Sequence, residues 1–528
     1  MRFRSSWVLS GALRRIASRL TALGLGVGLI VVAELLLRQC PVGDPSSAPD
    51  PFAGFSSSVP VFERAQRDDG VPVFRISSAR APRPSGEAAR EDGHEFLVHA
   101  PPAGVRIFVV GESSAAGVPY PGRYAFSSWI RSRLQAALPQ VPIEVVNASF
   151  SGYSSRRLLL VARAIAEHEP DAVVLYLGHN EWAESRYYQH LIDLDPRIFR
   201  VWEWTASTRL YGLTARLLSI PRQRAGPEIH EVDFDPARNS LEMFAVLRER
   251  AGESQLPSDR EWAYRDLLYE HNLQEMGRLF RAAGALPIFL TLSQNFADWP
   301  PGASSHATAA SAQELAEWER LCRRGDERAA ARRCVEALDL YRQALEIDGS
   351  HADLHYRVAS CHRELQQFEE ARRHYRLASD LDRVPHGAPT GFNEIIRGVA
   401  RRLDAPVVDV DAALASQSRD GLVGDDLFVD FIHPNLRAHQ AIAAAVVDGM
   451  REARFPLPAG QWRETAYAEP DPETLLRENP ELRSRELEMQ IVACQLARRE
   501  RCVRERAATL QRLDPENQVA RRVLPQIQ

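Results

Sequence analysis

Five short runs of apolar residues alternate along the chain with longer segments in which apolar positions recur every three or four residues. The runs are rich in Val, Ile, Leu and Phe, and each is followed by small or polar residues. They occupy residues 106–111, 143–150, 171–178, 285–295 and 405–414. Because nearly every position in them is apolar, they are typical of strands that are buried on both faces of a parallel sheet.

The segments between these runs have the periodicity of amphipathic helices. Helices are predicted at 123–138, 154–168, from near Glu181, at 261–284 and at 392–403. Strands that alternate with helices in this way form a parallel sheet covered by helices on both faces. The sequence therefore predicts a three-layer α/β domain.

Two segments interrupt this alternation. Residues 191–255 are irregular and carry several aromatic residues, and we expect a mixed helical insertion there. Residues 311–382 contain a period of 34 residues, which is the length of a tetratricopeptide repeat. The recurring residues are Ala337, Tyr341 and Ala344, then Ala371, Tyr375 and Ala378, with Val358, Ala359 and Phe368 also at packing positions. Small residues let helices approach closely, so the pattern predicts helix pairs, and a partner-binding surface on them is a separate hypothesis.

The N-terminus combines five arginines with the apolar residues 20–37. Such a helix spans about 27 Å, close to the roughly 30 Å hydrocarbon core of a bilayer. We predict a transmembrane helix at 20–38, with the N-terminus in the cytoplasm by the positive-inside rule. A cleaved signal peptide is the alternative, although the run is long for one and no A-x-A site follows. Residues 39–102 are predicted to be a linker, with a β-hairpin around Gly70 that lies against the α/β domain.

The composition limits the chemistry and the partners. All 65 basic residues are arginine, so chemistry that requires lysine is excluded. The net charge is −5 with both signs interspersed, and no nucleic-acid partner is expected. The six cysteines include no C-x-x-C pair, so no metal site is predicted. Cys322 with Cys334, and Cys494 with Cys502, are candidate disulfides in an exported protein.

Polar residues follow the predicted strands at their carboxyl ends, where open parallel sheets bind ligands. A serine hydroxyl becomes a nucleophile when a histidine takes its proton and a carboxylate orients that histidine. Backbone N–H groups and a side-chain amide can stabilise the resulting oxyanion. The candidate residues are Glu112, Ser113, Ser114, Asn147, Gly152, His179, Asn180, Asp430 and His433.

Four short blocks in this order resemble the SGNH/GDSL hydrolase family. They are GESS at 111–114, the glycine of SFSGYSS at 149–155, GHN at 178–180 and DFIH at 430–433. The resemblance covers about 106–190 and 285–445. It implies a flavodoxin-like fold with a five-stranded parallel sheet in the order 2-1-3-4-5.

The resemblance also implies a role for each matched residue. Ser113 would be the nucleophile, His433 the general base and Asp430 the residue that orients it, while Ser113, Gly152 and Asn180 would form the oxyanion hole. Ser114 is a competing nucleophile, but the family's serine directly follows the acidic position, which favours Ser113. Two further residues need an account: Glu112 replaces the family's usual aspartate, and His179 is expected to pack beside the site.

The chain is expected to divide into seven segments. They are a cytoplasmic arginine-rich segment (1–19), the transmembrane helix (20–38), the linker with its hairpin (39–102), the first part of the hydrolase domain (103–300), the repeat insertion (301–385), the last part of the hydrolase domain (386–456) and a helical, repeat-like tail (457–528). Because the insertion leaves the fold after the fourth strand, we expect it beside the active-site mouth, where it would select an acyl-bearing substrate or dock a partner.

The expected function is that of a bacterial inner-membrane serine hydrolase whose periplasmic domain cleaves an acyl ester through an acyl-serine intermediate. No metal or organic cofactor is expected. Transfer of the acyl group to a sugar hydroxyl would use the same residues, and an envelope glycan or lipid is the substrate class expected from the location. The alternative is a catalytically silent scaffold that binds a protein partner through its repeat helices.

Overall fold

The computed structural model describes most of the chain in two compact units, which are treated separately below. The described residues are 21–39 except 23 and 27, then 52, 54–77, 80, 91–187, 191, 194–217, 259–307, 310–464, 467–497 and 499–524. The smaller unit comprises residues 1–60 and 190–228, and the larger one comprises residues 61–189 and 229–528.

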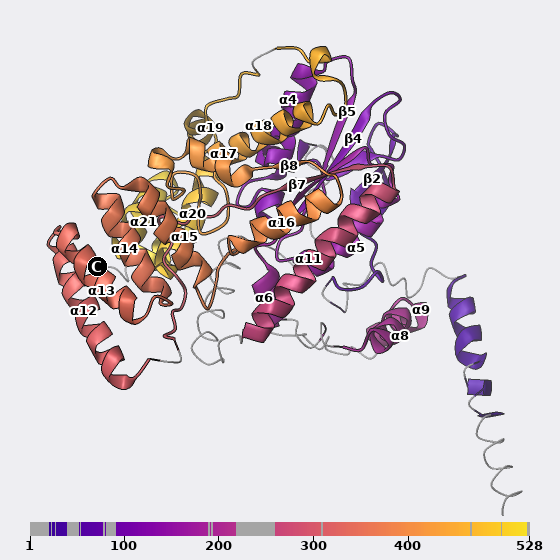
Figure 1. Cartoon of the computed structure of the whole chain (residues 1–528). Helices are drawn as coiled ribbons and strands as arrows, with labels where there is room; N and C mark the ends of the chain where they lie inside the picture. The colour runs from indigo at the N-terminus through magenta and orange to yellow at the C-terminus, as the bar shows by residue number, and fades with distance from the viewer. Residues whose placement is uncertain are drawn as a thin grey trace, which may run out of the picture. The chain divides into compact units, whose positions relative to one another are not determined.

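A five-stranded parallel sheet forms the centre of the larger unit (Figure 1). Its order is β5-β4-β6-β7-β8, which is 2-1-3-4-5 along the chain, as expected. Every residue of β4 and β6 is buried, in agreement with their unbroken apolar sequences. The strands are β4 (Val105–Gly111), β5 (Ile143–Asn147), β6 (Ala172–Tyr176), β7 (Leu286–Leu290) and β8 (Val407–Val408).

The fifth strand is much shorter than the apolar run at 405–414 predicts. It contains two residues, and helix α17 (Val410–Gln417) follows almost at once. The cause is Asp409, whose side chain accepts the backbone N–H of Ala412 and so caps the first turn of α17.

Helices cover both faces of the sheet (Figure 1). One face carries α4 (Phe126–Ala137) and α18 (Leu436–Glu452), which pack on each other. The opposite face carries α5 (Ser155–Ala166), α11 (Asp259–Ala282) and α16 (Gly391–Arg402). The predicted three-layer α/β arrangement is therefore confirmed. The described residues also form 3-10 helices at Gly122–Tyr124, Arg419–Gly421 and Ala459–Gln461.

The predicted hairpin is present and has a third strand. Strands β1 (Phe62–Gln66) and β2 (Pro72–Ile76) pair antiparallel, and β3 (Glu95–Leu97) pairs with β2. Buried residues of this small sheet belong to the core of the α/β domain. The buried Arg106 guanidinium joins the two sheets, because it donates to the Leu97 carbonyl at 2.7 Å and to the Glu144 carboxylate at 2.6 Å.

The repeat insertion consists of two helix pairs. The first is α12 (Ala312–Ala330) with α13 (Cys334–Ile347), and the second is α14 (Ala352–Glu364) with α15 (Phe368–Asp380). All six residues of the 34-residue period are buried, while Phe368 is half-buried. The first pair forms a separate hydrophobic core, to which α14 adds Leu354, Val358 and Cys361. The second pair also contributes Ala359, Ala371 and Tyr375 to the core of the α/β domain.

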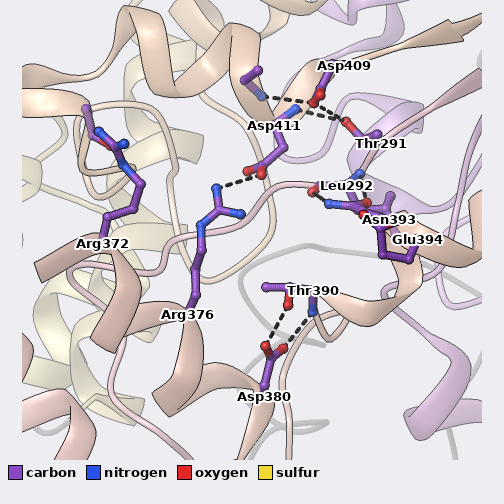
Figure 2. Close-up of polar contacts among 12 residues, drawn as sticks. Thr291, Leu292, Arg372, Arg376, Asp380, Thr390, Asn393, Glu394, Asp409 and Asp411 are labelled. Atoms are coloured by element: carbon purple, nitrogen blue, oxygen red, sulfur yellow. Dashed lines mark hydrogen bonds and ion pairs between the residues drawn. The ribbon is translucent and has the colours of Figure 1, made fainter. Parts of the chain in front are cut away.

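Polar contacts also fix the second pair to the α/β domain (Figure 2). Arg376 on α15 donates to the carboxylate of Asp411 at 2.6 Å. At the end of the same helix, Asp380 accepts the backbone N–H and the hydroxyl of Thr390 at 2.7 and 2.5 Å. The residues that receive these contacts lie at the starts of α17 and α16, so α15 is attached to the helices that flank the short fifth strand.

The C-terminal segment is helical, as predicted. It contains α19 (Pro472–Glu478), α20 (Pro480–Leu496), α21 (Glu500–Leu513) and α22 (Gln518–Val523). A disulfide joins Cys494 to Cys502 and so links α20 to α21. The other predicted disulfide is wrong: Cys322 and Cys334 are both free and buried in the core of the first repeat pair.

The smaller unit contains α8 (Pro196–Ala206) and α9 (Arg209–Leu217), in the segment where a mixed helical insertion is predicted. Residues 21–37 are helical wherever they are described. The carboxylate of Glu34 accepts the backbone N–H groups of Arg209 and Leu210 at the start of α9. Across the described ranges, no helix combines the length and apolar character needed to span a membrane. The expected arginine-rich segment 1–19 lies outside the described residues.

Candidate active site

The first catalytic candidate lies where β4 turns sharply into a helix. A side chain at Gly111 would collide with the backbone oxygen of Tyr176, so only glycine fits at the end of this strand. Helix α3 (Ser113–Ala116) begins two residues later and ends at Gly117, which has a φ of 105°. This turn places Ser113 at the carboxyl edge of the sheet, as the first residue of α3, where its backbone N–H has no acceptor within the helix.

Ser113, His433 and Asp430 form a continuous chain of hydrogen bonds. The Ser113 hydroxyl lies 2.8 Å from His433 Nε2, and His433 Nδ1 lies 2.6 Å from Asp430 Oδ2. The other carboxylate oxygen of Asp430 accepts the backbone N–H groups of Ile432 and His433 at 2.9 and 2.8 Å. All three side chains are buried, so two segments 320 residues apart bring a hydroxyl, an imidazole and a carboxylate together.

This order fixes the direction of proton flow. The carboxylate oxygen Oδ2 of Asp430 can only accept a hydrogen bond. Nδ1 of the neutral imidazole therefore carries the hydrogen, and Nε2 has a lone pair. That lone pair faces the Ser113 hydroxyl. The arrangement can therefore take the hydroxyl proton at Nε2 and stabilise the resulting imidazolium with Asp430.

The neighbouring serine has a different contact. The Ser114 hydroxyl donates to the backbone carbonyl of Ile432 at 3.0 Å, and the residue is 1% exposed. Ser114 thus joins the α3 turn to the loop that carries Asp430 and His433. Of the two candidate nucleophiles, the one whose hydroxyl meets the imidazole is Ser113.

The two expected oxyanion loops are joined to each other. Asn180 donates through Nδ2 to the Tyr153 carbonyl at 3.0 Å. Gly152, the residue before Tyr153, has a φ of 74°, a conformation that side chains disfavour. The structure therefore brings the loop after β5 next to the loop after β6.

Glu112 organises the loop after β6. Its carboxylate accepts the backbone N–H groups of Gly178, His179 and Asn180 at 3.0, 2.8 and 3.2 Å. Burial, and next the nearby Glu181, raise the pKa of Glu112 well above the usual value, while the three N–H donors oppose this shift. The sequence marks this residue only as a departure from the family's aspartate. In the structure it is the carboxylate that holds the whole GHN block.

Two more carboxylates, which the sequence reasoning missed, support these loops from helix α6 (Glu181–Tyr187). Glu184 accepts the backbone N–H of Ser154 at 3.1 Å and pairs with Arg157, which also donates to the Gly152 carbonyl. Glu181 accepts the N–H and hydroxyl of Ser155 at 2.6 and 2.9 Å. Burial raises the pKa of Glu181 to about 7. Their spacing of three residues directly after GHN is the signal that could have identified them.

Asn295, which the sequence reasoning also missed, fixes the loop of Asp430. Its amide donates to the Asp430 carbonyl at 3.0 Å and to Asp425 at 2.9 Å.

His179 is buried near the hydrogen-bonded chain, and its Nδ1 accepts the Ala388 N–H at 3.2 Å. Burial, and then the charge of His433, lower the pKa of His179 to about 3, so this ring is neutral. It packs beside the hydrogen-bonded chain, as expected.

A pocket lies next to the loop of His433. The Phe431 ring lines it and its centre is 6.2 Å from that of His433. Trp299 and His386 supply aromatic walls, and Tyr375 and Ser379 come from α15 of the repeat insertion. The insertion therefore forms part of a pocket beside the candidate site.

Comparison with known proteins identifies one part of the chain. Residues 328–386 match the family model described as tetratricopeptide repeat, and this range contains α13 and the second helix pair. No curated protein matches the chain.

Solved structures resemble the chain only remotely. LAE5, an alpha/beta hydrolase enzyme from the metagenome of Lake Arreo, is 13% identical, with 66% of this chain and 95% of that one covered and a TM-score of 0.29. Axe2, an acetylxylan esterase from Geobacillus stearothermophilus, gives the same four values. A GDSL-like lipase from Bacteroides thetaiotaomicron is 11% identical, with coverages of 66% and 88% and a TM-score of 0.27. Scores this low carry no argument about activity, which must come from the site itself.

Proposed function

We propose that this chain is a serine hydrolase that cleaves or transfers an acyl ester through a covalent intermediate on Ser113. The observation that carries the proposal is the buried hydrogen-bonded chain from Ser113 through His433 to Asp430. The neighbouring Ser114 instead donates to a backbone carbonyl. A serine whose hydroxyl meets a carboxylate-oriented imidazole is arranged for nucleophilic catalysis.

In the proposed first step, Ser113 Oγ attacks the ester carbonyl carbon and its proton passes to His433 Nε2. Asp430 stabilises the imidazolium. The carbonyl oxygen becomes negative and receives hydrogen bonds from the N–H groups of Ser113 and Gly152 and from the amide of Asn180. When the tetrahedral intermediate collapses, the C–O bond to the alcohol breaks, and His433 gives its proton to that alcohol.

In the second step, a hydroxyl group attacks acyl-Ser113 while His433 acts again as the base. If water attacks, the product is a carboxylic acid, and if a sugar hydroxyl attacks, the acyl group is transferred. The bond to Ser113 Oγ breaks and the proton returns to that oxygen. The chain's own residues suffice for both outcomes.

The test is hydrolysis of p-nitrophenyl acetate by the purified full-length chain. Wild type should release p-nitrophenol, Ser113→Ala should be inert, and Ser416→Ala, an exposed serine on α17, should match wild type. If wild type and Ser113→Ala are equally inert, the proposal fails. The family match at 328–386 would then favour the alternative, a scaffold that binds a protein partner through its repeat helices.

We further propose that the insertion selects the substrate through the pocket beside His433. The pocket combines aromatic walls with polar groups, among them Gln294, which donates to the Ser379 hydroxyl at 2.6 Å. Ser379→Phe should fill it, lowering kcat/KM for bulky esters while the acetate ester is still cleaved. Equal losses for both esters would contradict this role.

We also propose that residues 20–38 anchor the chain in a bacterial inner membrane, with the larger unit in the periplasm and an envelope glycan or lipid as substrate. The support is the sequence: arginines precede a long apolar run. Membrane fractions extracted with alkaline carbonate should retain the full chain, and added protease should degrade it in spheroplasts. Release by carbonate would overturn the anchor.

A further inference from the structure

Three potential metal ligands gather where the second repeat pair turns from α14 to α15. They are His362 on α14 and Glu370 and His374 on α15, and their ligand atoms all lie within 4.8 Å of one another. Glu370 and His374 are four residues apart, so they share one face of α15. The imidazoles of His362 and His374 are nearly parallel, at 17°, with ring centres 5.7 Å apart.

The hydrogen bonds around His374 determine which of its nitrogens carries the lone pair that could bind a metal. Nε2 of the neighbouring His355 faces the Gly349 carbonyl at 3.0 Å, and a carbonyl only accepts, so this nitrogen carries the hydrogen. Nδ1 of neutral His355 must then accept from Nδ1 of His374, which lies 2.8 Å away. His374 Nε2 is left with a lone pair.

The second histidine has the same arrangement. Nδ1 of His362 lies 2.6 Å from the side-chain oxygen of Gln367, so it donates there and Nε2 keeps the lone pair. Metal-bound histidines in proteins nearly always donate their other ring nitrogen to such an acceptor. Both histidines are therefore already held in the tautomer that a metal ion requires.

A positive group already contacts this cluster. One guanidinium nitrogen of Arg373 lies 2.7 Å from the Glu370 carboxylate and 3.0 Å from His374 Nε2. Its side chain is 59% exposed, so it can move into solvent without breaking the core. The cluster thus attracts a cation, and Arg373 is the group that a metal ion would displace.

We propose that His362, Glu370 and His374 bind Zn²⁺. Two imidazole nitrogens and one carboxylate oxygen form a donor set that suits zinc, whereas magnesium and calcium prefer oxygen ligands. Zinc bonds of about 2.0–2.2 Å require the three groups to close in slightly, and water completes the tetrahedron. The ion would join α14 to α15 and so stabilise the helix pair that lines the pocket beside His433. This inference does not depend on the proposed hydrolase activity.

The test is zinc binding by the full-length chain after removal of metals with a chelator. Equilibrium dialysis should show a site in wild type that Glu370→Gln and His362→Gln each weaken at least about tenfold. Glu369→Gln and His271→Gln change exposed side chains outside the cluster and should bind like wild type. Arg373→Gln should tighten binding, because it removes the competing cation.

Thermal unfolding provides a second measurement. Zinc should raise the Tm of wild type and of Arg373→Gln but not that of Glu370→Gln. Glu370 is exposed, so its substitution should leave the fold intact, unlike that of the buried His374. The proposal is overturned if wild type does not bind zinc, or if Glu370→Gln and His362→Gln bind it as tightly as wild type does.

Discussion

The loops of the candidate active site and the repeat insertion are stabilised by different interactions. In the loops, buried carboxylates accept backbone N–H groups, as Glu112 does from three successive residues. In the insertion, small residues such as Ala337 and Ala371 let helices pack closely, and most ion pairs lie at the surface. A substitution in the loops should therefore alter the chemistry, and one in the insertion should alter stability.

The second repeat pair is part of the insertion but also packs into the α/β domain. Its residues Ala359, Ala371 and Tyr375 belong to the core of the α/β domain. Its helix α14 also adds Leu354, Val358 and Cys361 to the core of the first pair. Deletion of residues 311–382 would thus open the α/β core and could not isolate the role of the insertion. Point substitutions separate the two regions more cleanly.

The largest effect is expected in the catalytic loops. Asp430→Asn should lower kcat for p-nitrophenyl acetate by about 10⁴-fold, because the amide no longer holds His433 in the tautomer that can accept the serine proton. Asp425→Asn is the matched control, since Asp425 bonds to the same Asn295 without touching His433. Similar losses in both variants would show that the loop, and not the carboxylate on His433, is what matters.

A smaller kinetic effect is expected at Glu112. Glu112→Gln places an amide against three N–H donors, so the loop of Asn180 should shift and kcat should fall by about 10²-fold. Circular dichroism and Tm should show that the chain still folds. Glu112→Asp keeps a carboxyl group and should retain more activity than Glu112→Gln. An unchanged kcat in Glu112→Gln would show that Glu112 does not position the loop of Asn180 for catalysis.

The two repeat pairs can be compared through equivalent alanines. Ala337→Leu and Ala371→Leu both overfill a packed helix interface and should each destabilise the chain by about 1–3 kcal/mol. Only Ala371 borders the α/β core, so only Ala371→Leu should also reduce esterase activity. Denaturant unfolding and ester hydrolysis measure the two effects. Equal activity in both variants would mean that packing of the second pair on the α/β domain does not affect the candidate active site.

The smallest effect is expected at the contact between α15 and α17. Arg376→Ala removes a half-exposed ion pair with Asp411 and should lower the free energy of unfolding by about 1 kcal/mol. The exposed Arg342, which pairs with Asp339 on α13, is the control, and Arg342→Ala should change stability by less. A larger loss in Arg342→Ala would contradict this assignment.

The sequence predicts the sheet well because its signals are local. Unbroken apolar runs are enough to find β4 and β6, and the 34-residue period is enough to find the helix pairs. The fifth strand is overestimated because Asp409 caps a helix in the middle of an apolar stretch. Strand β3 is too short to give a pattern of its own.

Long-range polar contacts are harder to predict. The role of Glu112 depends on a loop 66 to 68 residues further along the chain. Cysteine spacing gives no sign of the proposed zinc site, because its two histidines and one glutamate come together only when α14 and α15 pack. For Cys322 and Cys334 the sequence suggests a contact that does not form, since the two residues are close in sequence but make no disulfide.

The most direct test of the central claim is to label the full-length chain with a fluorophosphonate and locate the adduct by mass spectrometry. The probe reacts only with a serine that a neighbouring base has activated, so it reports on the contact between the hydroxyl at 113 and the imidazole at 433. We expect one adduct, on Ser113, that disappears in His433→Ala. Absence of labelling, or an adduct on Ser114, would contradict the proposed role of Ser113.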